Sequence, residues 1–114
     1  MKPLSTYQCT ATPASAEQLT EAEQSALCAQ VPNWQVVPIN GISQLQRNFK
    51  FDDFVQAIAF ANNITEIAES NDQHPTLLLS YGQVTVNWWS HSIAGLHHND
   101  FVLAAKTDEI YKAQ

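Results

Sequence analysis

The pair Asn40-Gly41 separates two runs in which apolar residues alternate with other residues. A type I′ turn needs a positive φ at both central residues, and Asn-Gly is the pair that accepts this most readily. The pair therefore predicts a β-hairpin over residues 34–51 in which Ile39 faces Ile42. Because Pro38 has no amide hydrogen, the first strand is expected at an edge or a bend of the sheet.

Alternation along this hairpin also predicts which of its faces belongs to the core. In the expected register Val36 faces Leu45, and both side chains lie on one side of the sheet. Aromatic residues extend this apolar face. Its members are Trp34, Val36, Leu45, Phe49 and Phe51.

A second hairpin is predicted over residues 77–90, with Gly82-Gln83 as its two-residue loop. Glycine at the first central position favours a type II′ turn, and such a turn makes Tyr81 face Val84. One face of this hairpin is then apolar, and the other is mixed and partly polar.

The first helix is expected after a mobile leader of residues 1–14, which is rich in Thr, Ser, Pro and Ala. Ser15 is the expected N-cap, with Gln18 at the reciprocal position of a capping box. An apolar stripe at helical spacing follows, and residues 31–33 end the helix.

Two further helices are predicted. One starts at Asp52 or Asp53 and stops near residues 69–71, and the other is capped by Asn99 or Asp100 and runs to about Lys112. The inward stripe of the former is expected to comprise Phe54, Ile58, Ala61, Ile64 or Thr65, and Ala68. The order helix, hairpin, helix, hairpin, helix predicts an α+β fold, a four-stranded antiparallel sheet with helices on one face. A chain of 114 residues is expected to form one domain, 1–114.

Composition limits the function. The net charge is −6, and no basic patch offers itself to nucleic acid or to an anionic membrane. No run of about 18 apolar residues suggests a membrane span, and the N-terminus lacks the apolar centre of a secretory signal. Cys9 and Cys28 form no C-x-x-C motif, which favours two free thiols in a cytoplasmic protein.

All four histidines, His74, His91, His97 and His98, fall within residues 69–100. The expected hairpin register places His74 opposite His91, with Cβ atoms roughly 5 Å apart if the ladder extends that far. Two imidazoles beside carboxylates could supply one proton donor and one acceptor near neutral pH, although surface or capping roles remain an alternative.

A metal site is the other alternative for these histidines. No pair has the spacing of a zinc motif, so no metal is predicted, and His97 and His98 are expected to be solvated loop residues. A nucleophilic Cys–His pair is not supported either.

The spacing Glu69-x3-Gln73-His74-Pro75-x5-Tyr81-x9-His91-x8-Asp100 resembles the signature of the pterin-4a-carbinolamine dehydratase family. The segment from Val84 to Glu109 is also similar to bacterial members, and the resemblance covers about residues 19–108.

The resemblance implies a lyase that dehydrates 4a-hydroxytetrahydropterin to a quinonoid dihydropterin and so recycles the pterin cofactor of aromatic amino-acid hydroxylases. It implies no metal or other cofactor, a homodimer or homotetramer, and a functional link to such a hydroxylase. His74 and His91 would be the catalytic residues. Substrate-binding residues would be Glu69, Asp72, Gln73, Trp89, Ser90, Ser92 and Asp100.

Gln73 departs from the family signature, which has a histidine at this position. An amide can hydrogen-bond a substrate but cannot transfer a proton at ordinary pH. The sequence therefore supports a dehydratase of reduced activity and, as the alternative, a non-catalytic binding or assembly module.

Overall fold

The computed structural model describes residues 2–114 of the chain. Helices and strands follow the predicted order, with two short 3₁₀ helices added. The elements are η1 (Leu4–Thr6), α1 (Glu21–Cys28), β1 (Gln35–Ile39), β2 (Ile42–Lys50), α2 (Phe54–Asn71), β3 (Thr76–Ser80), β4 (Gln83–Trp88), η2 (His91–Ile93) and α3 (His98–Lys112).

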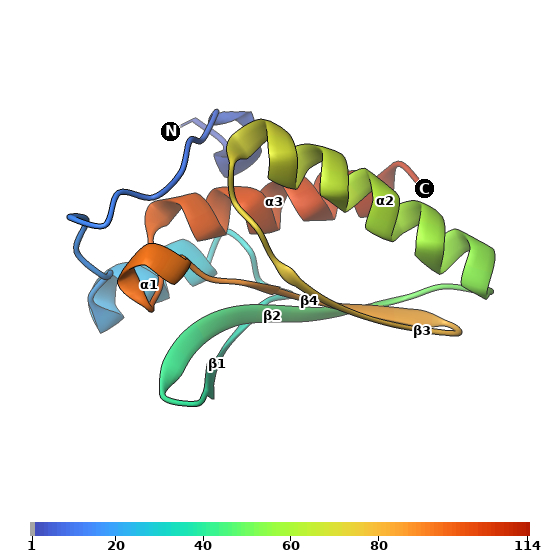
Figure 1. Cartoon of the computed structure of the whole chain (residues 1–114), viewed down its shortest axis with the longest axis horizontal. Helices are drawn as coiled ribbons and strands as arrows, with labels where there is room; N and C mark the ends of the chain where they lie inside the picture. Colours follow the sequence, from blue (N-terminus) through green and yellow to red (C-terminus); the bar gives the residue numbers. More distant parts are fainter. Residues whose placement is uncertain (1) are drawn as a thin grey trace.

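The four strands form one antiparallel sheet in the order β1-β2-β4-β3. Figure 1 shows α2 and α3 on the same side of this sheet, and no helix of the described residues covers its other face. The predicted α+β fold is therefore confirmed. Pro38 lies in β1, an edge strand, where its missing amide hydrogen costs no ladder bond to a further strand.

The first hairpin has the predicted register. Ile39 pairs with Ile42, and Asn40 and Gly41 have φ values of 52° and 79°, as a type I′ turn requires. The predicted apolar face is also present, since Leu45 and Phe49 are fully buried.

The second hairpin differs from its predicted register by two positions. Ser80 pairs with Gln83, so the loop is Tyr81-Gly82 rather than Gly82-Gln83. A shift of two keeps every side chain on its face, so the apolar pattern could not distinguish the registers. Gly82 is needed for a close approach instead, because a Cβ there would lie 3.1 Å from the Phe51 carbonyl oxygen.

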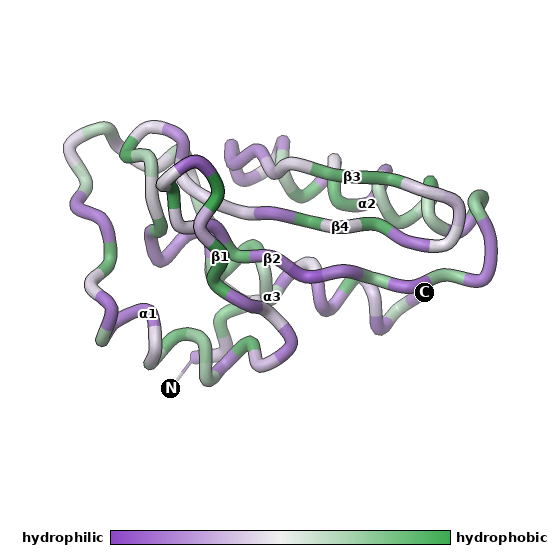
Figure 2. Tube along the Cα trace, turned by 90° about the horizontal axis from the view of Figure 1, so that it is seen from below, coloured by the Kyte–Doolittle hydropathy of each residue, from purple (hydrophilic) through white to green (hydrophobic). Residues whose placement is uncertain are grey.

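The core lies between the sheet and the helices α2 and α3. In Figure 2 the tube of β3 and β4 passes directly over that of α2. The stripe predicted for α2 is partly wrong, because Phe54 is 45% exposed. The buried positions of this helix are Ala57, Phe60, Ile64, Ala68 and Asn71.

Two of the predicted helix caps are also wrong. Thr20, not Ser15, caps α1, and it forms a capping box with Glu23. His97 caps α3, with Asp100 as the reciprocal residue of its capping box. Asp53 caps α2 as predicted.

The N-terminal segment packs on the protein rather than forming the expected mobile leader. Leu4 and Cys9 are buried, and the Cys9 amide donates to Asn71 Oδ1 at the end of α2. The Lys106 ammonium on α3 donates to the Ser5 carbonyl oxygen. Sequence composition gave no sign of these contacts, which join positions far apart in the chain; Met1 lies outside the described residues.

Both cysteines are free thiols, as predicted, and burial raises the pKa of each. Of the helices within residues 2–114, none combines the length and the apolar character needed to cross a bilayer.

Candidate active site

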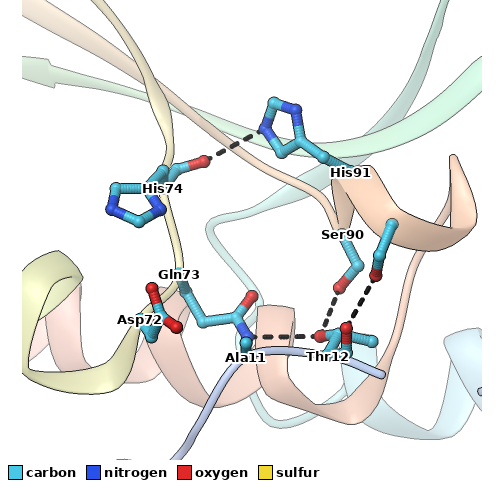
Figure 3. Close-up of a pocket in the computed structure, with 8 residues that line it drawn as sticks. Ala11, Thr12, Asp72, Gln73, His74, Ser90 and His91 are labelled. Carbon is cyan, nitrogen blue, oxygen red and sulfur yellow. Dashed lines mark hydrogen bonds between the residues drawn. The ribbon is translucent and has the colours of Figure 1, made fainter. Parts of the chain in front are cut away.

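A cavity of about 340 Å³ opens where the N-terminal segment crosses between the end of α2 and the link from β4 to α3. Figure 3 shows the side chains of these three segments facing one another across it. The lining residues are Ala11, Thr12, Asp72, Gln73, His74, Ser90, His91 and Ser92.

The way in which α2 ends places Gln73 and His74 at the cavity. Asp72 adopts the left-handed conformation with φ 50°, and the Gln73 amide donates to the Ala68 carbonyl oxygen at 3.0 Å. This is the Schellman arrangement, in which glycine is usual and a short polar residue is tolerated. The reversal buries the Gln73 side chain and leaves that of His74 exposed.

Gln73 is held by the N-terminal segment. Its amide nitrogen Nε2 donates to the Thr10 carbonyl oxygen at 2.7 Å and to Thr12 Oγ1 at 3.2 Å. In Figure 3 the Gln73 oxygen is directed away from Thr12, into the space between the labelled side chains.

His74 is paired with Glu69, one turn back on α2. The distance from His74 Nε2 to Glu69 Oε2 is 2.7 Å, and both side chains are more than half exposed. Exposed pairs of this kind contribute little to stability. Their effect is to orient the ring, since a carboxylate accepts the Nε2 hydrogen and leaves Nδ1 available.

His91 lies beside His74, as the sequence predicted, but the two do not form a cross-strand pair. The ladder between β3 and β4 ends at Thr76 and Asn87. His91 Nε2 instead donates to the His74 carbonyl oxygen at 3.2 Å (Figure 3). The His91 ring is stacked on Trp89 with a centroid distance of 4.1 Å.

A chain of hydrogen bonds runs from the cavity into the interior. Thr12 Oγ1 lies 2.9 Å from Ser90 Oγ, and Ser90 Oγ donates to Asp100 Oδ2 at 2.8 Å. Because the single Ser90 hydrogen is used on the carboxylate, Thr12 is the donor in the first of these bonds.

Asp100 is fully buried and its second oxygen, Oδ1, has no hydrogen-bond partner within residues 2–114. Burial raises its pKa to about 7, against the opposing effect of the bonds from the His97 amide and Ser90 to Oδ2. Because Oδ2 already accepts two hydrogen bonds, we expect a proton taken up by this carboxyl group to reside on Oδ1, which leaves Oδ2 as an acceptor for Ser90.

The residues that sequence predicted for the site fall into three groups according to where they lie relative to the cavity. Asp72, Gln73, His74, Ser90, His91 and Ser92 line the cavity. Glu69 and Trp89 contact the rings of His74 and His91, and Asp100 lies behind Ser90. Ala11 and Thr12 were missed, because nothing in a segment of small and polar residues indicates a long-range contact.

His97 and His98 are not the solvated loop residues that sequence suggested. His97 Nδ1 accepts the Asn99 amide at 3.1 Å, and burial together with the neighbouring His98 lowers the pKa of His97. The His98 ring packs edge-on against Tyr7. Nowhere in residues 2–114 do three or more His, Cys, Asp or Glu side chains gather in a way that could hold a metal ion.

Comparison with known proteins gives close relatives over nearly the whole chain. A protein of Marinobacter nauticus is 49% identical over 97% of this chain and all of its own length. One from Nitrosococcus oceani is 47% identical over 98% of this chain and 99% of its own. The names of both place them among the pterin-4-alpha-carbinolamine dehydratases.

Solved structures with a similar fold also come from pterin dehydratase or pterin dehydratase-like proteins. The crystal structure of a transcriptional coactivator/pterin dehydratase from Brucella melitensis matches with a TM-score of 0.75 and 32% identity, over 82% of this chain and 98% of that one. A pterin dehydratase-like protein identified as a RuBisCO assembly factor in the alpha-carboxysome shares the fold, with a TM-score of 0.59 and 19% identity over 69% and 89% of the two chains. The family model for pterin 4 alpha carbinolamine dehydratase matches residues 17–110, and the chain belongs to this family.

Proposed function

We propose that the protein is a hydro-lyase that removes water from 4a-hydroxytetrahydropterin. The observation that carries this proposal is the placement of His74 and His91 at one cavity, each with its Nε2 engaged by an oxygen. Within residues 2–114 no group bonds either Nδ1, so each ring has one nitrogen free for proton transfer.

The reaction needs one acid and one base. The C4a–O bond breaks as the hydroxyl takes up a proton and leaves as water, while N5 loses its hydrogen and forms a double bond to C4a. The substrate gains one proton and loses one, so a protonated and a neutral imidazole suffice. We assign His91 as the principal acid and base, and His74 as the residue that positions the pterin and serves as a second proton-transfer group.

The cavity suits a small bicyclic ligand. Its volume of about 340 Å³ is at the lower end of the range for small-molecule sites, and its lining mixes apolar atoms with a few polar groups. We assign Asp72, Gln73, Ser90 and Ser92 as groups that contact the substrate. Glu69, Trp89 and Asp100 act through the residues that they touch.

The family resemblance extends the proposal beyond the site. We propose 4a-hydroxytetrahydrobiopterin as the substrate, recycling of an aromatic amino-acid hydroxylase cofactor as the role, and the cytoplasm as the location. We also propose self-association into a homodimer or homotetramer, which sedimentation equilibrium would measure.

The direct test follows dehydration of freshly prepared 4a-hydroxytetrahydropterin. The wild-type protein should accelerate the reaction above its spontaneous rate, and His91→Ala should remove most of that acceleration. If both proteins gave only the spontaneous rate, the assignment as a dehydratase would be wrong.

A second candidate function is a non-catalytic binding or assembly module. Gln73 favours it, because the family signature has a histidine there, and the assembly factor named above shows that this fold also occurs in a protein described by an assembly role. Gln73→His separates the two candidates. A gain in dehydration rate by His over Gln indicates an intact but weakened dehydratase, whereas no rate in either protein and no pterin binding favours the module.

A further inference from the structure

The Gln73 amide can adopt only one orientation in its hydrogen-bond network. The Thr10 carbonyl oxygen can only accept, so the group facing it must be the amide nitrogen. The group that faces Thr12 Oγ1 must also be the amide nitrogen, because the single Thr12 hydroxyl hydrogen is directed at Ser90 Oγ and the oxygen can only accept from Gln73. Both hydrogens of Gln73 Nε2 are therefore used inside the protein.

Thr12 is saturated by these bonds. Its oxygen accepts from Gln73 Nε2 and from Asn99 Nδ2, each at 3.2 Å, and its hydrogen is donated to Ser90. A hydroxyl has two lone pairs and one hydrogen, so no capacity is left for another arrangement. Asp100 Oδ2 is the last acceptor in this series of hydrogen bonds. It therefore sets the direction of the bond from Ser90 and, through Ser90, of the bond from Thr12.

The Gln73 oxygen, by contrast, has no hydrogen-bond partner among residues 2–114. Among residues 2–114 the buried side-chain polar atoms without a partner comprise only Asp100 Oδ1, so the Gln73 oxygen is not sealed from the cavity. Figure 3 shows this oxygen on the cavity side of the amide. Position 73 thus presents a hydrogen-bond acceptor and no donor.

We propose that Thr12 is a positioning residue that holds the Gln73 amide oxygen towards the cavity, where this oxygen selects pterins that carry a hydrogen on N5 or on a 4a-hydroxyl. The inference rests on the proposed function. It adds a specificity that a neutral histidine would not impose, because an imidazole can donate or accept at the same place.

This acceptor distinguishes substrate from product. The substrate carries both the N5 hydrogen and the 4a-hydroxyl hydrogen, and dehydration removes both. The quinonoid product presents the N5 lone pair, which an amide oxygen repels. A site built to hydrogen-bond a donor rejects the ligand that lacks it, so the arrangement favours product release.

Two stable ligands test the selectivity under anaerobic conditions. A tetrahydropterin carries the N5 hydrogen, whereas the matching 7,8-dihydropterin has an N5 lone pair instead. Titration calorimetry should show the tetrahydropterin binding about 3- to 10-fold more tightly to the wild-type protein, the range expected for one net hydrogen bond. Thr12→Val should bring the ratio below about twofold, and Thr12→Ser should restore it.

A control and a second readout separate positioning from general damage. Thr6→Val makes the same change in the same segment, at an exposed hydroxyl that donates to the Pro3 carbonyl oxygen, and should keep the wild-type ratio. In NMR spectra the Gln73 side-chain amide hydrogens should exchange with water faster in Thr12→Val than in Thr12→Ser, because one of their two hydrogen bonds is lost. If Thr12→Val does not fold, Gln73→Met removes the acceptor directly and should also abolish the preference.

The outcomes separate the two proposals. A ratio that persists in Thr12→Val or in Gln73→Met would overturn the inference while leaving dehydration intact. A Thr12-dependent preference in a protein without dehydratase activity would support the inference and reject the catalytic role. Failure of both ligands to bind would reject the pterin site and the inference together.

Discussion

The two sides of the cavity differ in their exposure to water. On one side the imidazoles of His74 and His91 are exposed, and each is held by a single hydrogen bond at Nε2. We call these two residues the histidine side. On the other, Thr12, Gln73 and Ser90 are buried and joined in one directed chain that ends at Asp100. We call these four residues the relay side.

The difference assigns different tasks to the two sides. Rings in contact with water can exchange protons with it after each turnover, which a general acid or base requires. Buried hydrogen bonds are stronger and cannot be exchanged for bonds to water, so the relay side fixes an orientation instead. Substitutions on the histidine side should therefore affect rate, and those on the relay side should affect stability and ligand preference.

The largest expected effect is on the histidine side. His91→Ala should lower the dehydration rate by roughly 10²- to 10⁴-fold, the usual cost of losing a general acid or base. Its free energy of unfolding should change by less than about 1 kcal/mol, because the side chain is exposed. Urea denaturation beside the rate assay measures both. His98→Ala, outside the cavity, is the control, and an equal loss of rate in it would contradict the assignment.

On the relay side, Asp100→Asn should change the pH dependence of stability. The pKa of Asp100 is raised to about 7 by burial, so between about pH 4 and pH 7 the folded protein holds a proton that the unfolded chain has released. The contribution of Asp100 to the stability of the wild-type protein therefore falls as pH rises through that window. Asparagine cannot ionise, so the variant shows no such fall.

The stability of Asp100→Asn relative to wild type should therefore increase by about 2 kcal/mol between pH 5 and pH 7.5. The lowered pKa of His97 makes stability rise, not fall, as pH increases towards the ordinary histidine pKa. This contribution is present in both proteins and cancels in the difference between them. Urea denaturation at the two pH values gives the result. A difference independent of pH would show that Asp100 is ionised throughout.

Ser90→Ala interrupts the relay side in its middle. Thr12 loses its acceptor and Asp100 Oδ2 loses a donor, and leaving buried polar groups unsatisfied should cost about 1–2 kcal/mol. Thermal or urea unfolding tests this. Ser80→Ala, an exposed serine at the end of β3, should cost less than about 0.5 kcal/mol, and an equal cost at the two positions would argue against a buried network.

The smallest effect is expected for Glu69→Gln on the histidine side. Glu69 orients His74 from an exposed position, where ion pairs contribute about 0.2–1 kcal/mol. The dehydration rate should fall by less than about fivefold and stability should hardly change. Glu66→Gln, also exposed on α2, is the matched control. A loss as large as that of His91→Ala would make the Glu69–His74 pair the principal catalytic unit.

Local signals predicted most of the fold. The turn chemistry of Asn40-Gly41 fixed one hairpin register, and Asp53 marked the start of α2. The register of the other hairpin was predicted wrongly, because a shift of two residues preserves the apolar face. Gly82 allows a close approach to the Phe51 carbonyl oxygen and does not have a positive φ. Spacing patterns reflect what a residue's neighbours in sequence require, whereas the need for this glycine comes from the backbone of Phe51, which follows β2.

Sequence predicted residues on both sides of the candidate site, but not the part that the N-terminal segment contributes. Gln73, His74, Ser90 and His91 lie close to the spacing motif and were identified. Thr12 was not, because its partners at positions 73 and 90 are set by tertiary packing alone.

The crossing of the N-terminal segment over the cavity has a consequence for the order of folding. The bond between Thr12 and Ser90 joins residues 78 positions apart. Such a contact closes a long loop, and the entropy cost of closing it is offset only after the elements between its ends have assembled. We therefore expect residues 4–12 to dock onto a sheet and an α3 that have already formed. In this order His74 and His91 would come together before the docking step, and the orientation of Gln73 would be established only when docking is complete.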